Sequence, residues 1–147
     1  MDADALISLE PNRIDVKTLL DELRKAGLRN TYRKGDLNDP IGAVVNIEDD
    51  FRNRVDLLMN IQGITEDVFS RVVEAEFMNA RIRLIGIEDL IAMKIFAGSP
   101  KDLDDVTGVL KVSYDRINMA LLKELVQRYG KGALDKLQSF LKGLSTE

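Results

Sequence analysis

The chain of 147 residues contains neither cysteine nor histidine. The absence of cysteine excludes disulfide bonds and thiolate metal sites. The absence of histidine removes the commonest zinc ligand and the most frequent general base of enzymes. Proton transfer by such a chain would therefore depend on Asp, Glu, Lys or Tyr side chains, or on metal-bound water.

Long apolar runs and an excess of positive charge are also missing. No apolar run reaches the roughly 18 residues of a membrane-spanning helix, so we expect no membrane partner. The N-terminus has no basic segment followed by an apolar core, which predicts a cytoplasmic protein without a secretion signal. The net charge of −4 argues against nucleic acid as a main partner.

The remaining composition is that of a soluble globular protein, with 45% apolar and 31% charged residues. The length favours one domain over residues 1–147. Alternating patterns dominate residues 1–86 and helical spacing dominates residues 87–147. The predicted fold class is therefore α/β: a mixed β-sheet with packed helices and a helical C-terminal half.

The individual elements follow from periodicity and from capping residues. Asn12 is the expected N-cap of the first helix, which Gly27 ends; Gly98 ends a later helix, and Ser99 caps the next one. We predict strands over residues 3–9, 28–34, 43–47, 55–60 and 81–85, and helices over residues 12–27, 65–73, 87–98, 99–110, 118–129 and 132–144.

Three aspartates lie in the apolar, strand-like stretches. Asp2 and Asp4 are two residues apart, so a strand points both to one face, about 6.5–7 Å apart. Asp56 lies in a second such stretch, and a neighbouring strand can bring it to the same patch as Asp4. Three carboxylates of this kind suit one or two Mg²⁺ ions, which can clamp both oxygens of a phosphoryl displacement.

Each aspartate also has a simpler interpretation. Asp2 and Asp4 can be ordinary solvated charges near a chain end. An aspartate inside a strand is disfavoured, so Asp56 needs a local partner. A metal ion is one such partner, and a salt bridge to Arg52 or Arg54 is the other.

A lysine and two further acids are candidates in the helical half. Lys94 lies between apolar residues of a helix, where its stem can cover the core while its ammonium group stays in water. Asp102 fits the N3 position of a capping box from Ser99. Asp105 can pair with Lys101 or with Lys94.

Several segments of the chain, in the order in which they occur, resemble the nucleotidyltransferase fold of the DNA polymerase beta superfamily. The likeness is greatest to the small bacterial minimal nucleotidyltransferases and abortive-infection toxins. The likeness covers about residues 2–130. It rests on the Asp-x-Asp strand, a following hairpin with a third carboxylate, a strand leading to a lysine-bearing helix, and a Lys-Asp-x-x-Asp signature. These are residues 2–7, 39–45, 54–58, 81–94 and 101–105.

The resemblance implies a metal-dependent enzyme that transfers a nucleotidyl group from an NTP to an unknown acceptor. Mg²⁺ would bind Asp2, Asp4 and Asp56. Asp56 would also assist deprotonation of the acceptor hydroxyl, and Lys94 would neutralise phosphate charge. A toxin-like member acting on tRNA, another RNA or a protein is a variant of this hypothesis; the alternative is a non-catalytic interaction module.

The family also has a helix and a Gly-Ser phosphate loop before its Asp-x-Asp strand. In the given sequence only Met1 precedes Asp2. The resemblance therefore predicts weak binding of Mg²⁺ and NTP. It also predicts a homodimer, formed through apolar sheet surface that the upstream helix covers in the family.

Overall fold

The computed structural model describes residues 2–8 and 15–144, except for the side chains of Asp2 and Leu144. The chain divides into two compact units, Met1–Gln62 and Gly63–Glu147. The single domain over residues 1–147 stays a prediction.

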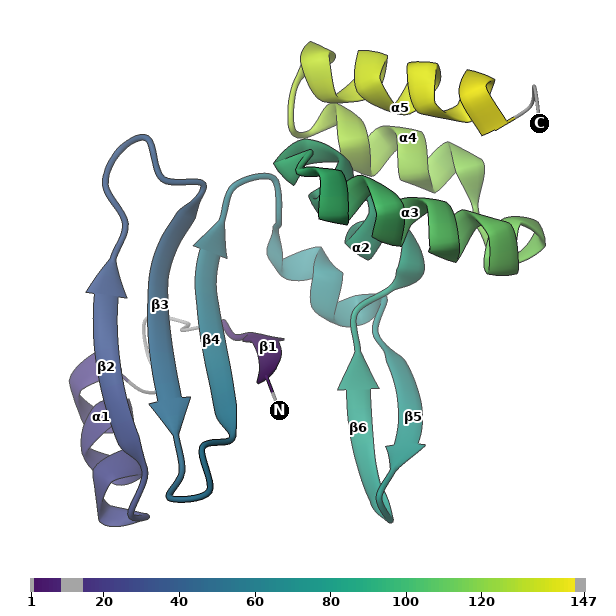
Figure 1. Ribbon diagram of the computed structural model, residues 1–147. Coiled ribbons are helices and arrows are strands. Elements are labelled where there is room, and N and C mark those ends of the chain that lie inside the picture. Colours follow the sequence, from purple (N-terminus) through teal and green to yellow (C-terminus); the bar gives the residue numbers. More distant parts are fainter. Residues whose placement is uncertain (1, 9–14, 145–147) are drawn as a thin grey trace. The chain divides into compact units, whose positions relative to one another are not determined.

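The first unit is a four-stranded sheet with one helix (Figure 1). The strand order is β1-β4-β3-β2, with β1 parallel to β4 and the other pairs antiparallel. The sheet is therefore mixed, as predicted. Its elements are β1 (Asp2–Leu6), α1 (Val16–Lys25), β2 (Arg29–Lys34), β3 (Ile41–Glu48) and β4 (Arg54–Ile61).

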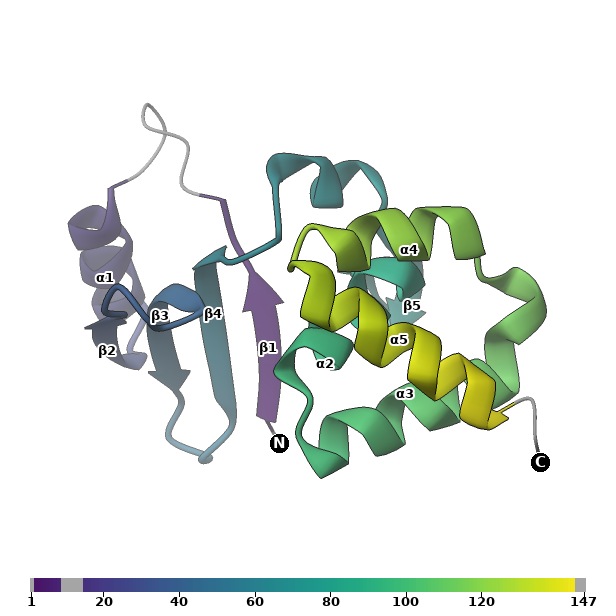
Figure 2. The ribbon, with the colours of Figure 1, turned by 90° about the horizontal axis from the view of Figure 1, so that it is seen from above.

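One face of this sheet forms the apolar core of the first unit. Ala43, Val45 and Ile47 of β3 and Met59 of β4 are buried. Apolar residues of α1 pack against them: Val16, Leu20 and Leu23. Figure 2 shows the strands in the order β2, β3, β4, β1, with α1 beside β2. Because strand residues alternate between faces, the residues between these apolar ones form the opposite face.

Local interactions determine where helix α1 begins and ends. The Asp15 carboxylate accepts a hydrogen bond from the Thr18 backbone N–H at 2.7 Å and so caps the N-terminus. Gly27, with φ of 79°, follows the helix in the left-handed conformation that favours glycine, as predicted. The expected N-cap at Asn12 lies outside the described residues.

The second unit contains a two-stranded hairpin and a helical bundle. Its elements are η1 (Glu66–Ser70), β5 (Val73–Phe77), β6 (Ala80–Leu84), α2 (Ile87–Ala97), α3 (Pro100–Ser113), η2 (Tyr114–Arg116), α4 (Met119–Gln127) and α5 (Lys131–Leu144). The helical C-terminal half and the α/β class are confirmed. None of the described helices is long and apolar enough to cross a membrane.

Helix α2 is the centre of the bundle. Ile91, Ala92 and Ile95 are almost completely buried, and α3, α4 and α5 contribute apolar side chains around them. The predicted caps are present at the junction with α3: Gly98 ends α2 with φ of 66°, and Ser99 and Asp102 form a capping box. Reciprocal capping satisfies backbone N–H groups that a helix start leaves unpaired.

The predicted helix over residues 65–73 is wrong beyond Ser70. A short 3₁₀ helix occupies Glu66–Ser70, and Val73 begins strand β5. The apolar residues Val73, Ala75 and Phe77 alternate with glutamates, which is the period of a strand. Met78 and Asn79 then form the hairpin turn with φ of 50° and 61°, and β6 follows as predicted.

Candidate functional site

A polar row crosses the face of the first sheet opposite α1. The strand register aligns Thr31 of β2, Asn46 of β3, Asp56 of β4 and Asp4 of β1. Neighbouring strands are about 4.8 Å apart, so the row is continuous across all four strands. The structure thus places Asp4 beside Asp56 on adjacent strands, as predicted.

Asp56 is the most strongly held side chain of this row. The Arg54 guanidinium donates to both of its oxygens, at 2.9 Å from Nε to Oδ1 and 2.8 Å from Nη2 to Oδ2. Asn46 Nδ2 donates a third hydrogen bond to Oδ1 at 2.8 Å. Thr31 Oγ1 in turn donates to Asn46 Oδ1 at 3.3 Å, which fixes the orientation of the amide.

These contacts keep the Asp56 carboxylate ionised. The hydrogen bonds from Arg54, with a smaller contribution from Asn46, lower the pKa of Asp56, although partial burial acts in the opposite direction. A carboxylate with a lowered pKa is a good cation ligand at neutral pH and a weak proton acceptor. Of the two roles expected for Asp56, proton acceptance is the one that this lowered pKa opposes.

The other two predicted metal ligands are both on β1. Asp4 is exposed and in register with Asp56, whereas Asp2 is in register with Arg54. The side chain of Asp2 is not described. Among the described side chains, no group of three or more Asp and Glu residues is arranged to hold a metal ion. The role of Asp2, Asp4 and Asp56 as a metal triad therefore stays a prediction.

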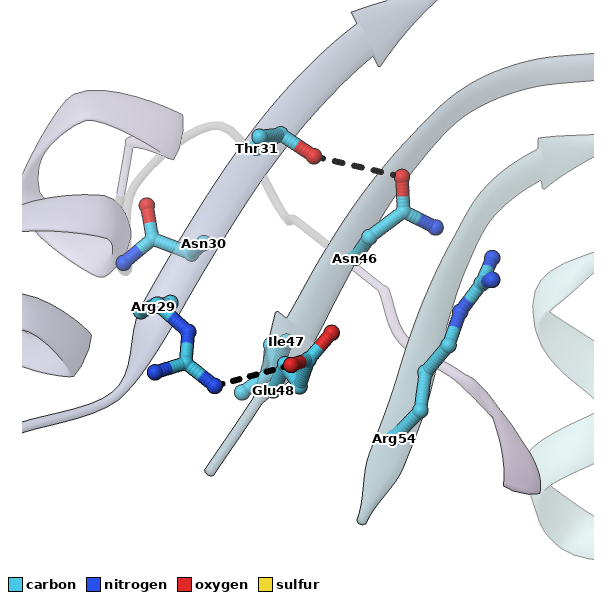
Figure 3. A pocket seen from close by; sticks show the side chains of 7 residues that line it. All are labelled: Arg29, Asn30, Thr31, Asn46, Ile47, Glu48 and Arg54. Atoms are coloured by element: carbon cyan, nitrogen blue, oxygen red, sulfur yellow. Dashed lines mark hydrogen bonds and ion pairs between the residues drawn. The ribbon is translucent and has the colours of Figure 1, made fainter. Parts of the chain in front are cut away.

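A pocket of about 390 Å³ opens on the same polar face, next to Asn46 and Arg54 (Figure 3). Its other polar residues are Arg29, Asn30 and Thr31 of β2 and Glu48 of β3. Arg29 is already bound: Nη2 donates to Glu48 at 2.8 Å, and Nη1 donates to Asp50 at 3.1 Å. The pocket thus combines two guanidinium groups with two amides, a hydroxyl and a carboxylate.

Lys94 belongs to a separate cluster in the second unit. Its ammonium group lies 2.7 Å from Asp105 and 3.2 Å from Asp102. Asp105, followed by Asp102, raises the pKa of Lys94 against the effect of burial. The lysine therefore does more than cover the core with its stem, because it joins α2 to the first two turns of α3. Its catalytic role stays a prediction.

A third charged cluster ties η1 to helices α2 and α4. Arg71 donates to both oxygens of the buried Asp89, at 2.8 Å and 2.7 Å, and to Asp67 at 2.7 Å. Arg128 of the segment after α4 also binds Asp67, at 3.0 Å. The hydrogen bonds from Arg128, Arg71 and Thr65 hold the pKa of Asp67 well below its usual range.

Sequence reasoning identified the aspartates but missed part of their surroundings. Asn46, Arg29 and Thr31 lie in predicted strands and Glu48 in a predicted hairpin, but the sequence predicts no site role for any of them. The available signal was an asparagine inside an apolar strand, where it is disfavoured. The salt bridge proposed for Asp56 exists, and Arg54 is the partner.

Comparison with known proteins now adds one finding. A family model described as "Nucleotidyltransferase of unknown function (DUF6036)" matches residues 1–140. This range contains Asp2, Asp4, Asp56 and Lys94. No curated protein matches the chain significantly.

Proposed function

The chain belongs to this nucleotidyltransferase family, and from that premise we propose that it transfers a nucleotidyl group from an NTP to an acceptor hydroxyl with Mg²⁺ on Asp2, Asp4 and Asp56. The observation that carries the proposal is the register of Asp4 with Asp56 on adjacent parallel strands. It supports a shared cation site, since two carboxylates in such proximity repel one another unless a positive charge lies between or beside them.

The donor set fits the ion. Mg²⁺ prefers carboxylate oxygens and retains several water molecules, so the exposed Asp4 and the partly exposed Asp56 are suitable types of ligand. A guanidinium group already bonded to both Asp56 oxygens is further support, because it shows that a positive charge is accommodated there. When bound, Mg²⁺ would polarise the transferred phosphoryl group and neutralise its charge.

The residues of the row would have distinct tasks in this reaction. Asn46 orients the Asp56 carboxylate from the side of β3. The acceptor oxygen forms a bond to the α-phosphorus, the bond from this phosphorus to the bridging oxygen breaks, and pyrophosphate leaves. Asp56 would receive the hydroxyl proton, and it could do so only with a pKa higher than Arg54 now allows. Lys94 is the predicted neutraliser of phosphate charge.

The second candidate is a non-catalytic interaction module with the same fold. The observation that favours it is the completeness of the Asp56 contacts, since Arg54 and Asn46 satisfy the carboxylate without any ion. In this alternative the polar row stabilises the sheet. This alternative predicts that the wild type transfers no nucleotidyl group, so a change at Asp56 has no activity to remove.

Transfer of label from α-³²P-labelled NTPs tests the proposal. The protein is incubated with Mg²⁺, each NTP and either total RNA or a protein extract as the acceptor pool. We expect labelled acceptor with the wild type and none with Asp4→Asn or Asp56→Asn. Asp21→Asn is the matched control, because it makes the same chemical change on α1, and it should keep full activity. Labelling by the wild type at the level of a sample without protein would support the module.

A further inference from the structure

Arg54 occupies the position at Asp56 where a metal ion is expected. Both residues are on β4, two positions apart, and the guanidinium bonds to each carboxylate oxygen. A carboxylate offers about four acceptor positions. Arg54 takes two of them and Asn46 takes a third. A divalent cation approaching Asp56 therefore meets a positive charge beside nearly filled acceptor positions.

The Arg54 guanidinium is also positioned so that it can move away from Asp56. The Arg54 side chain is 51% exposed, whereas that of Asp56 is 21% exposed. Water can therefore solvate the guanidinium once it is released, and partial exposure screens the attraction between the two charges. Arg54 also lines the pocket on the same face, so open space adjoins its present position (Figure 3).

Arg29 lines the same pocket and provides the natural contrast. It carries the same charge, but its carboxylate partners are Glu48 and Asp50 rather than Asp56. A change at Arg29 removes one positive charge from the polar face and leaves the contacts of Asp56 intact. The two arginines thus separate a general effect of charge from direct competition for one carboxylate.

We propose that Arg54 is an internal counter-cation of the candidate metal site, which a divalent cation must displace from Asp56 before it can bind there. The proposal rests on the proposed function, because that function requires metal on Asp56. Arg54 is then a positioning residue: it holds Asp56 ionised and oriented without metal, and it sets the metal concentration at which the site fills.

Mn²⁺ binding tests this without any enzymatic assay. Free Mn²⁺ is measured by electron paramagnetic resonance during titration of the full chain, with Mn²⁺ as the oxygen-preferring substitute for Mg²⁺. We expect Arg54→Gln to bind Mn²⁺ about fivefold more tightly than the wild type, as expected for loss of a partly exposed competing ion pair. Arg54→Lys should lie between the two, because a lysine cannot make the two-pronged contact.

Two control variants and three possible outcomes complete the test. Asp56→Asn should lose the site, and Arg29→Gln should stay within about twofold of the wild type, as for a charge held by other partners. Unchanged or weaker Mn²⁺ binding by a folded Arg54→Gln protein, with wild-type binding that depends on Asp56, would overturn the role of Arg54 alone. Mn²⁺ binding that is seen only in Arg54→Gln, and that is lost when Asp56→Asn is added, would support the proposed role of Arg54. No Asp56-dependent binding in either protein would overturn the metal site itself and the inference with it.

Discussion

Two arginine–aspartate pairs of nearly identical geometry lie in different environments. Arg54 and Asp56 on the first sheet are joined by hydrogen bonds of 2.9 Å and 2.8 Å, and Arg71 and Asp89 in the second unit by bonds of 2.8 Å and 2.7 Å. The first pair is 51% and 21% exposed, the second 21% and 7%. Bond geometry alone therefore does not distinguish them, whereas access to water does.

The neighbours of each pair explain what this difference means. Asp89 lies in the first turn of α2, and its partner Arg71 also binds Asp67, which binds Arg128. This network connects η1 to two helices and has a structural task. Asp56, in contrast, neighbours an exposed carboxylate and an open pocket. A carboxylate that water and solutes can reach is the better candidate for binding.

Asp89→Asn should produce the largest change in stability. Removing one charge from a buried pair leaves Arg71 incompletely compensated, which typically costs 3–5 kcal/mol. Asp67 still binds Arg71, so we expect a loss of about 3 kcal/mol in the free energy of unfolding. Urea denaturation followed by circular dichroism measures it, with Asp104→Asn on the exposed surface of α3 as the control. A loss below about 1 kcal/mol would mean that the Arg71–Asp89 pair contributes no more to stability than an exposed ion pair.

Acid should weaken the same network through Asp67. Its pKa is lowered from 3.8 by hydrogen bonds from Arg128, Arg71 and Thr65. A group with a lowered pKa in the folded state contributes stability above its unfolded pKa and loses it as the pH falls through the folded value. Wild-type stability should therefore decrease below about pH 4, where an unfolded aspartate begins to take up its proton.

Asp67→Asn should flatten this part of the pH profile. Asp67 is 39% exposed, so solvent screening limits the difference at neutral pH to about 1 kcal/mol. Urea denaturation at several pH values from about 2 to 7 gives the profile. Asp135→Asn on α5 controls for the removal of one acidic charge. Parallel pH profiles of the wild type and Asp67→Asn would contradict the assignment of the acid-induced loss of stability to Asp67.

The sequence predicted most elements correctly where local signals determine the structure. Helices α2 to α5, the capping box of Ser99 and Asp102, and the glycine after α1 all follow from spacing and terminal residues. Strand β5 was missed because Thr65 resembles a helix N-cap. The predicted helix ends at Val73, the first residue of β5, and no strand is predicted over residues 74–77.

The site could be predicted only in part, because strand register is not a local property. Asp4 and Asp56 were expected to be neighbours since both interrupt apolar strands. The contact of Asn46 with Asp56 depends on how β3 aligns with β4, and the pocket depends on how β2 aligns with β3. A shift of one residue would send these side chains to the other face. Tertiary packing of the apolar face against α1 fixes that register.

Lys94→Met extends the comparison to a pair of intermediate exposure. Lys94 and Asp102 are each 24% exposed, and the methionine keeps the apolar stem. We expect a loss below about 1 kcal/mol in the free energy of unfolding. We expect nucleotidyl transfer to fall at least about tenfold if the ammonium neutralises phosphate charge. Leu103→Met on α3 is the apolar control, and full activity of a folded Lys94→Met protein would exclude the role.

Asp56→Asn should have the smallest effect on stability, although its pair matches that of Asp89 in geometry. Two changes oppose one another: the substitution removes the ion pair with Arg54 and also removes repulsion between Asp56 and the adjacent Asp4. Arg54 is half-exposed, so water replaces the lost contact. Each effect is below about 1 kcal/mol, and we expect a net change within about 0.5 kcal/mol.

The measurement is the same urea denaturation, and Asp4→Asn is the informative companion. It keeps the Arg54 pair and removes only the repulsion, so its stability should equal or slightly exceed that of the wild type. A loss of 2 kcal/mol or more in Asp56→Asn, which is on the order of that for a buried pair, would mean that Asp56 holds the sheet together. The polar row would then be structural like the network around Asp89. A negligible loss, together with lost Mn²⁺ binding, would separate the two pairs by function.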